Sequence, residues 1–201
     1  MPDTSVTARI PLDHPNTILL RLASWWSRRA YGDVLEPGMA MLHNRKVLIA
    51  NVSNERRVAK WDALDNTVKS LAVLAAAGAV ECSWCMDFGY WMSYNEGVDP
   101  RKLEEIPRWR ASDAYTDVER LVMAYAEAMT ATPLEVTDEM VSQLREHLSD
   151  AALVELTAMV ALENQRSRTN SALGLTSQGF KARCELRPSV VRRPAAVREA
   201  G

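Results

Sequence analysis

Hydrophobic side chains recur along the chain at the spacing of helices, and the clearest case precedes a pair of cysteines. The spacing i, i+4, i+7 and i+11 marks one face of a helix and is followed by Leu64, Val68, Leu71 and Ala75. A continuous apolar stretch over residues 71–78 then leads to Cys82 and Cys85. Alternating patterns typical of strands are hard to find. We therefore expect an all-α protein in which a buried helix ends at the cysteine pair.

The helices before this stretch are marked by apolar spacing and by breakers. A helix is predicted from Pro15 to a C-terminal cap at Gly32. Residues 36–38 read as a turn, followed by one or two helices over residues 39–49 that end in the polar run 51–60.

After the cysteines, capping signals predict where further helices begin. Asp99 before Pro100 is an N-cap followed by proline at the first helical position, and that helix should stop before Pro107. Thr116 and Glu119 have the spacing of a capping box. Further helices should begin near Thr137 and, for a long helix over residues 150–172, at Ser149. We expect seven to nine helices in all.

Composition narrows the class of protein. The chain has 201 residues, 47% of them hydrophobic, and can bury one full core with tails. A net charge of -2 gives no reason to expect a surface that binds nucleic acid. No apolar run approaches the roughly 20 residues of a membrane-spanning helix. The N-terminus lacks the pattern of a signal peptide, so we expect a cytoplasmic protein, where a permanent structural disulfide is unusual.

Two cysteines three residues apart admit three interpretations: a reversible dithiol, half of a zinc site, or inert packing. On a helical turn, positions i and i+3 share a face, so Cys82 and Cys85 can form and break a disulfide. A structural zinc site needs four ligands, and the other candidates are scattered along the chain: His14, His43, His147 and Cys184. We expect no metal, and expect Cys184 to be a surface thiol in a basic tail.

Residues 71–77 entering Cys82-Ser83-Trp84-Cys85, together with the stretch from Leu153 to Asn170, resemble the carboxymuconolactone decarboxylase family. The cysteine pair resembles its thiol-active branch, the alkylhydroperoxidase D proteins. The resemblance covers roughly residues 35–178, which leaves an N-terminal helical extension over 1–34 and a basic tail, expected to be poorly ordered, over 179–201.

The resemblance implies an alkylhydroperoxidase D-like helical bundle that assembles as a homo-oligomer, usually a trimer or hexamer. It also implies a thiol-dependent peroxidase in which Cys85 attacks a small hydroperoxide and Cys82 resolves the sulfenic acid to a disulfide. No cofactor is implied, and an external thiol reductant would complete the cycle. The sequence departs from what the resemblance implies at two positions. Where a glutamate and a histidine are expected to relay a proton, this chain has Ser70 and Gly89.

Without these groups, the pair would rest near the ordinary thiol pKa of about 8.5. The nearest carboxylates are Glu81 and Asp87; Asp87 is a candidate base for the thiol and equally a charge at a helix N-terminus. Lys69 is a candidate source of positive charge.

Two other interpretations remain open at this point. Three charged residues on an otherwise apolar helix either pair with one another or with a neighbouring chain, or they grip a carboxylate substrate: Glu163, Arg166 and Arg168. The second case would suit a decarboxylase-like enzyme acting on a small carboxylic acid, although the decarboxylase branch uses no cysteine pair. The last interpretation is a non-enzymatic oligomer with vestigial cysteines.

Overall fold

The computed structural model describes residues 8–185, and within that range the regular elements are helices, as predicted. This part of the chain contains ten α-helices and one 3-10 helix, more than the seven to nine expected. In chain order they are α1 (Ile18–Tyr31), α2 (Glu36–Met41), α3 (Arg45–Val58), α4 (Asn66–Ala79), α5 (Ser83–Glu96), α6 (Pro100–Glu105), η1 (Ile106–Ala111), α7 (Asp117–Thr130), α8 (Asp138–Arg145), α9 (Asp150–Ala172) and α10 (Phe180–Glu185).

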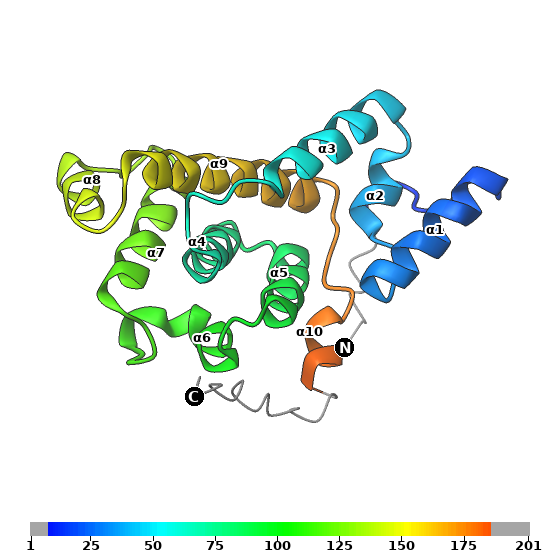
Figure 1. Ribbon diagram of the computed structural model, residues 1–201. Coiled ribbons are helices and arrows are strands. Elements are labelled where there is room, and N and C mark those ends of the chain that lie inside the picture. The colour runs from blue at the N-terminus through cyan, green and yellow to red at the C-terminus, as the bar shows by residue number, and fades with distance from the viewer. Residues whose placement is uncertain (1–7, 186–201) are drawn as a thin grey trace, which may run out of the picture.

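Helix α4 is the centre of the bundle, surrounded by α5, α7 and α9 (Figure 1). It packs most extensively against α7 and α9, and its alanines let these helices approach closely. Four of its side chains have no exposed area: Leu71, Ala72, Ala76 and Ala77. The apolar stretch that leads to the cysteines is therefore the core helix that the sequence predicts.

Most helix starts follow the caps seen in the sequence. Thr116 and Glu119 form the complete capping box at α7. Asp99, Thr137 and Ser149 cap α6, α8 and α9 with their side-chain oxygens. Gly32 ends α1 in the left-handed conformation, at φ 80°.

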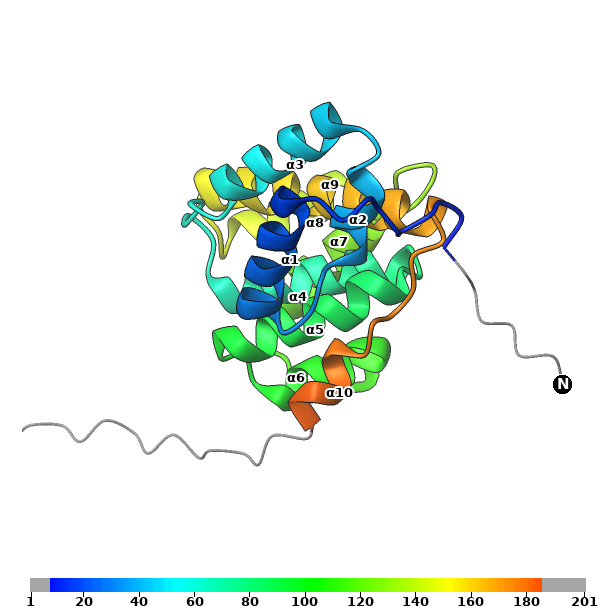
Figure 2. The same cartoon turned by 90° about the vertical axis from the view of Figure 1, so that its right-hand side faces the viewer.

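The N-terminal helices α1, α2 and α3 form an arm beside the bundle (Figures 1 and 2). Two predictions are wrong here. Residues 36–38 are the first turn of α2, because a proline is tolerated where the helix has no intrahelical N–H bond to lose. The polar run after residue 50 lies inside α3, whose solvent-facing side needs no apolar residues.

The C-terminal segment also corrects an expectation. Residues 180–185, assigned to a poorly ordered tail, form α10, which packs against α5. Phe180 has no exposed area and anchors this helix in the core. Cys184, expected at the surface, is buried in the main hydrophobic cluster. The remainder of the expected tail lies outside the described residues.

Candidate active site

The turn between α4 and α5 places Cys82 at the start of a helix. Glu81 has φ 59°, in the left-handed region, and the N–H of Cys82 donates to the carbonyl of Ala77 at 3.0 Å. This pattern closes α4 in the manner of a Schellman motif, with glutamate in the position where glycine is most frequent. The chain reverses within three residues, and Cys82 becomes the N-cap of α5.

Cys82 and Cys85 are joined in a disulfide, with their Cα atoms 5.3 Å apart. The N–H of Cys85 also lies 3.3 Å from Cys82 Sγ and donates to it. Both residues are buried, with 1% of Cys82 and 7% of Cys85 exposed. In the reduced protein, the N-terminus of α5 favours negative charge on these sulfurs, because unsatisfied N–H groups and the helix dipole stabilise a thiolate.

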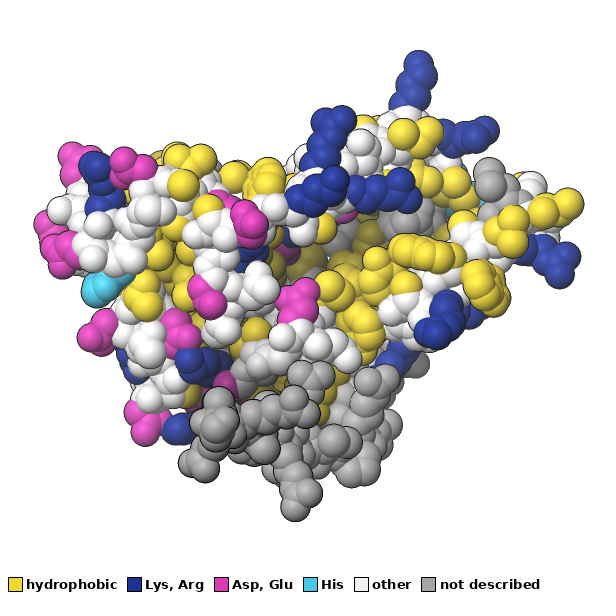
Figure 3. Space-filling view, viewed as in Figure 1, with side chains coloured by type: hydrophobic (Ala, Val, Ile, Leu, Met, Phe, Trp, Pro, Cys, Tyr) yellow, Lys and Arg dark blue, Asp and Glu magenta, His cyan; other side chains and the backbone are white. Residues whose placement is uncertain are grey.

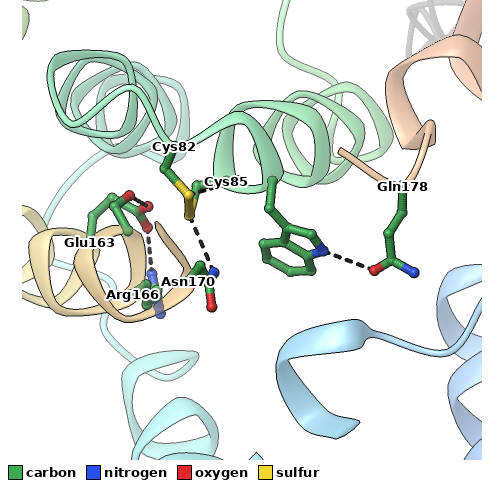
Figure 4. Close-up of a disulfide and its surroundings, with 8 residues drawn as sticks. Cys82, Cys85, Glu163, Arg166, Asn170 and Gln178 are labelled. Carbon is green, nitrogen blue, oxygen red and sulfur yellow. Dashed lines mark hydrogen bonds and ion pairs between the residues drawn. A yellow bond between two sulfur atoms is a disulfide. The ribbon is translucent and has the colours of Figure 1, made fainter. Parts of the chain in front are cut away.

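Helix α9 presents a polar stripe to the disulfide. Glu163, Ser167 and Asn170 lie at i, i+4 and i+7, so they share one face of the helix. All three are buried, at 3%, 0% and 3% exposure. Asn170 Nδ2 donates to Cys85 Sγ at 3.4 Å, and Figure 4 shows Glu163 on the same side of α9, turned toward the sulfurs.

Glu163 has a buried carboxyl group whose loss of hydration is only partly offset by its hydrogen-bond and charge partners. Ser167 Oγ donates to its Oε1 atom at 2.7 Å, and Arg166 reaches its Oε2 atom at 3.4 Å. Burial raises the pKa of Glu163 from 4.5 to about 7, against the opposing effects of Arg166 and Ser167. Its protonated and ionised forms are therefore both populated at neutral pH.

The two arginines of α9 are engaged within the chain. Arg166 binds Glu55 of α3 through two nitrogens, at 2.9 and 2.5 Å. Arg168 donates to the carbonyl of Thr130 at 3.1 Å and lies 3.4 Å from Asn164 Oδ1. Of the alternatives left open by the sequence, pairing within the chain is the one that these contacts favour.

Asp87 lies on the far side of α5 from the cysteines. Two residues correspond to roughly 200° around a helix, so its side chain points away from Cys85. Its carboxylate accepts the backbone N–H groups of Gln178, Phe180 and Lys181 at 2.9, 3.0 and 2.7 Å. The structure thus uses Asp87 to hold the N-terminal end of α10.

Trp84, between the two cysteines, connects the site to the arm. Its Nε1 atom donates to Gln178 Oε1 at 2.8 Å. Figure 4 labels Gln178 and marks this bond with a dashed line. The same oxygen accepts the N–H of Glu36 at 3.1 Å, and Gln178 Nε2 donates to the carbonyl of Val34 at 3.0 Å. Gln178 therefore joins the start of α5 to the segment between α1 and α2.

The other candidates lie away from the sulfurs. Lys69 forms an ion pair with Glu155 at 2.5 Å and donates to the carbonyl of Trp61 at 2.7 Å, in the first turns of α4 rather than at its cysteine end. The rings of His14 and His43 contact each other at a tilt of 49°, with centroids 4.5 Å apart, in the N-terminal region. Their Nε2 atoms donate to the carbonyls of Met39 and Pro11. Within residues 8–185, no three His, Cys, Asp or Glu side chains gather in a group that could hold a metal ion.

Sequence reasoning missed Ser167, Asn170 and Gln178 as neighbours of the cysteine pair. A signal existed for the first two: at i+4 and i+7 from Glu163 they continue a polar stripe along one face of the helix. Gln178 gave no such signal, because it lies in an irregular segment after α9.

Comparison of the sequence with known proteins identifies the family of this chain. The sequence profile of the carboxymuconolactone decarboxylase family matches residues 50–128. The uncharacterized protein YnjA of Escherichia coli K12 is 34% identical over 167 residues, which cover 81% of this chain and 90% of YnjA.

Solved structures share the fold. A peroxidase-related protein of Ralstonia eutropha JMP134, described as an alkylhydroperoxidase AhpD core, superposes with a TM-score of 0.76 at 16% identity, over 90% of this chain and 98% of that one. The debrominase Bmp8 superposes with a TM-score of 0.73 at 19% identity, over 90% and 96% of the two chains. In residues 8–185, no helix is long and apolar enough to cross a membrane. The chain belongs to the carboxymuconolactone decarboxylase family and has the all-α fold of its AhpD-like members.

Proposed function

We propose that this protein is a thiol-dependent peroxidase or disulfide-exchange enzyme that cycles Cys82 and Cys85 between dithiol and disulfide. The observation that carries the proposal is the disulfide at the N-terminus of α5, with Asn170 donating to Cys85 Sγ. A hydrogen-bond donor aimed at sulfur strengthens when the sulfur becomes an anion, so it stabilises the reactive thiolate. An inert pair packed as two small hydrophobes needs no such donor.

The proposed cycle uses two thiols for each hydroperoxide. The Cys85 thiolate attacks the terminal oxygen of the hydroperoxide, the O–O bond breaks, and the alkoxide leaves as an alcohol after taking a proton. Cys82 then attacks the sulfur of the Cys85 sulfenic acid, the disulfide forms, and water leaves. An external dithiol reduces the disulfide and is itself oxidised.

Cys85 is the better candidate for the attacking residue. It is the more exposed of the two, at 7% against 1%, and it receives the Asn170 donor. Cys82 would resolve the intermediate from the N-cap position of α5, where its own thiolate is also stabilised. The external reductant suits a cytoplasmic setting, which we propose for this protein along with a trimeric or hexameric assembly.

The alternative function on a small carboxylic acid has weaker support. It requires Arg166 or Arg168 to bind a substrate carboxylate, yet Arg166 already holds Glu55 through two nitrogens and Arg168 bonds a backbone carbonyl. The alternative of vestigial cysteines does not account for the polar stripe buried against them.

Peroxide consumption by the reduced protein tests the proposal. Wild type is supplied with dithiothreitol and an alkyl hydroperoxide, beside Cys85→Ser and Cys82→Ser. We expect turnover in wild type, none in Cys85→Ser, and a sulfenic acid that can be trapped in Cys82→Ser. If all three proteins consume peroxide no faster than buffer, the peroxidase is excluded.

The shared fold with a debrominase adds a second substrate to this assay. The same three proteins are given 2,3,4-tribromopyrrole, which has been crystallised with Bmp8, and bromide release is measured. Bromide release that needs both cysteines, without peroxide consumption, would move the proposal from peroxides to organic halides.

A further inference from the structure

At the positions where the resemblance implies two proton-relay groups, this chain has Ser70 and Gly89, and the polar stripe on α9 offers a replacement. Glu163 lies two turns before Asn170 on the face that contacts Cys85 Sγ. Figure 4 shows its carboxylate on the side of α9 that faces the disulfide. Glu163 is the acidic residue of this stripe and is 3% exposed. It lies on a different helix from Ser70, the residue at the position where a relay glutamate was expected.

The hydrogen bonds of Glu163 leave it able to hold or release a proton. Its short bond is to the neutral hydroxyl of Ser167, at 2.7 Å. The nearest cation, Arg166, lies 3.4 Å away and directs its shorter bonds to Glu55. A buried carboxylate held by a full ion pair would stay ionised, whereas this one is only partly neutralised.

We propose that Glu163 is the proton carrier of the cysteine pair, giving a proton to the sulfur that leaves when the disulfide opens and taking a proton from the thiol that attacks. The inference rests on the proposed redox cycle of Cys82 and Cys85, and it places the proton carrier of that cycle on α9. The pKa of about 7 that burial gives Glu163 supports the assignment, because the group can act in both directions at neutral pH.

Protons and electrons balance in both directions. When the disulfide is opened, a reductant thiolate attacks one cysteine sulfur and the S–S bond breaks. The second sulfur leaves as a thiolate and receives the proton of Glu163. The other thiol of the reductant then displaces the attacked cysteine from the mixed disulfide, its proton passes through solvent to that cysteine, and the reductant leaves as a cyclic disulfide. When the pair is oxidised, the ionised Glu163 takes the proton of the Cys85 thiol. The thiolate then attacks the peroxide, and Glu163 returns the proton to the departing oxygen.

Charged groups of two helices act on this carboxyl. Arg166 on α9 forms an ion pair with it, and Glu55 of α3, which also pairs with Arg166, acts on it through its charge. The cysteine pair lies at the start of a third helix, α5. Glu55 raises the pKa of Glu163, whereas Arg166 lowers it.

The experiment measures the rate at which dithiothreitol opens the Cys82–Cys85 disulfide between pH 5.5 and 9, expressed per reductant thiolate. In wild type, this normalised rate should fall as pH rises through about 7, because Glu163 loses the proton that it donates. Glu163→Gln should show no such step and should be roughly 10²-fold slower at pH 6, the usual size of a general-acid effect.

Two further variants separate proton transfer from structure. Glu163→Asp keeps a carboxyl group and should keep a pH step, although at a lower rate. Glu155→Gln removes another buried carboxyl of α9, eight residues or about 12 Å away along the helix, and should leave the step unchanged.

The outcomes distinguish the two proposals. If wild type and Glu163→Gln open with the same pH profile, Glu163 carries no proton for the pair, and this inference falls while the redox cycle stands. If the wild-type disulfide is not opened by dithiothreitol at any pH, the redox cycle falls and takes this inference with it.

Discussion

Asn170 on α9 donates a hydrogen bond to the Sγ atom of Cys85 on α5, across 3.4 Å and 85 positions of sequence. A donor to a charged acceptor contributes about 1.5 to 3 kcal/mol, so its loss should disfavour the Cys85 thiolate. In a Cys82→Ser background, Asn170→Leu should move the midpoint of iodoacetamide alkylation upward by about one to two pH units.

Asn95→Leu is the matched control for this experiment. Asn95 is an exposed asparagine on α5 whose Nδ2 atom donates to the carbonyl of Trp91. Its replacement should leave the alkylation midpoint where it is. An unchanged midpoint in Asn170→Leu as well would show that the bond to sulfur does not support the thiolate.

Asp87→Asn should loosen α10 without disturbing the cysteines. The substitution weakens three bonds from backbone N–H groups to the carboxylate, and loss of a helix cap costs about 0.5 to 2 kcal/mol. Hydrogen exchange should therefore accelerate at residues 178–184, while thiol alkylation at pH 7 stays within twofold of wild type. Asp138→Asn, in the exposed first turn of α8, controls for the lost charge. A large loss of thiol reactivity with unchanged exchange would return Asp87 to the role of a base.

The buried Glu163 should make folding stability depend on pH. An acid whose pKa rises on folding binds its proton more tightly in the folded chain, so its stabilising contribution is complete below about pH 4.5 and is lost as pH rises through about 7. The shift corresponds to about 3 kcal/mol. Glu163→Gln should therefore gain stability relative to wild type between pH 5 and 8 in urea unfolding.

The control for that measurement is Glu104→Gln, which replaces an exposed carboxyl on α6. The unfolding free energy of this variant should change with pH between 5 and 8 in the same way as that of wild type. If Glu163→Gln also runs parallel to wild type, the carboxyl of Glu163 does not titrate between pH 5 and 8.

The arm carries an apolar surface suited to assembly. Large hydrophobic side chains on α1 and α3 are 42 to 78% exposed, and Figure 3 shows hydrophobic side chains gathered over this part of the molecule. They are Ile18, Leu22, Trp25, Trp26, Val47, Ile49 and Val52. Leu22→Glu with Trp25→Glu should convert a trimer or hexamer to monomers in light scattering coupled to size-exclusion chromatography.

Leu134→Glu serves as the control for assembly, because Leu134 is 68% exposed but lies in the loop between α7 and α8, outside α1 and α3. It should leave the mass unchanged. A wild-type protein that is already monomeric would exclude the proposed assembly.

The helices were predictable because their signals are local. The caps at Thr116, Thr137 and Ser149 act within one turn of their own helix, and the apolar period of α4 needs no knowledge of its neighbours. Helix α10 was missed because the nearby arginines dominate the composition of the segment, whereas its position depends on one residue, Phe180, and on a distant partner, Asp87.

The site was predictable only at the cysteines themselves. Asn170 contacts Cys85, and Glu163 lies on the same face of α9, because α9 packs against α4 and α5, which no local pattern encodes. Gly89 lies close to the core. A Cβ atom at Gly89 would lie 2.9 Å from Leu74 Cδ2, and Leu74 is 1% exposed, so this core accepts a larger side chain at position 89 only if Leu74 moves.

Hydrogen bonds of Gln178 connect the cysteine pair to the arm. Its side chain holds Trp84, which stands between the two cysteines, and also the backbone at Val34 and Glu36. Such coupling is reciprocal. If oxidation of the cysteines strengthens these hydrogen bonds, then holding the arm in place favours the disulfide by the same free energy. The reduction potential of the cysteine pair would then depend on how firmly the arm is held.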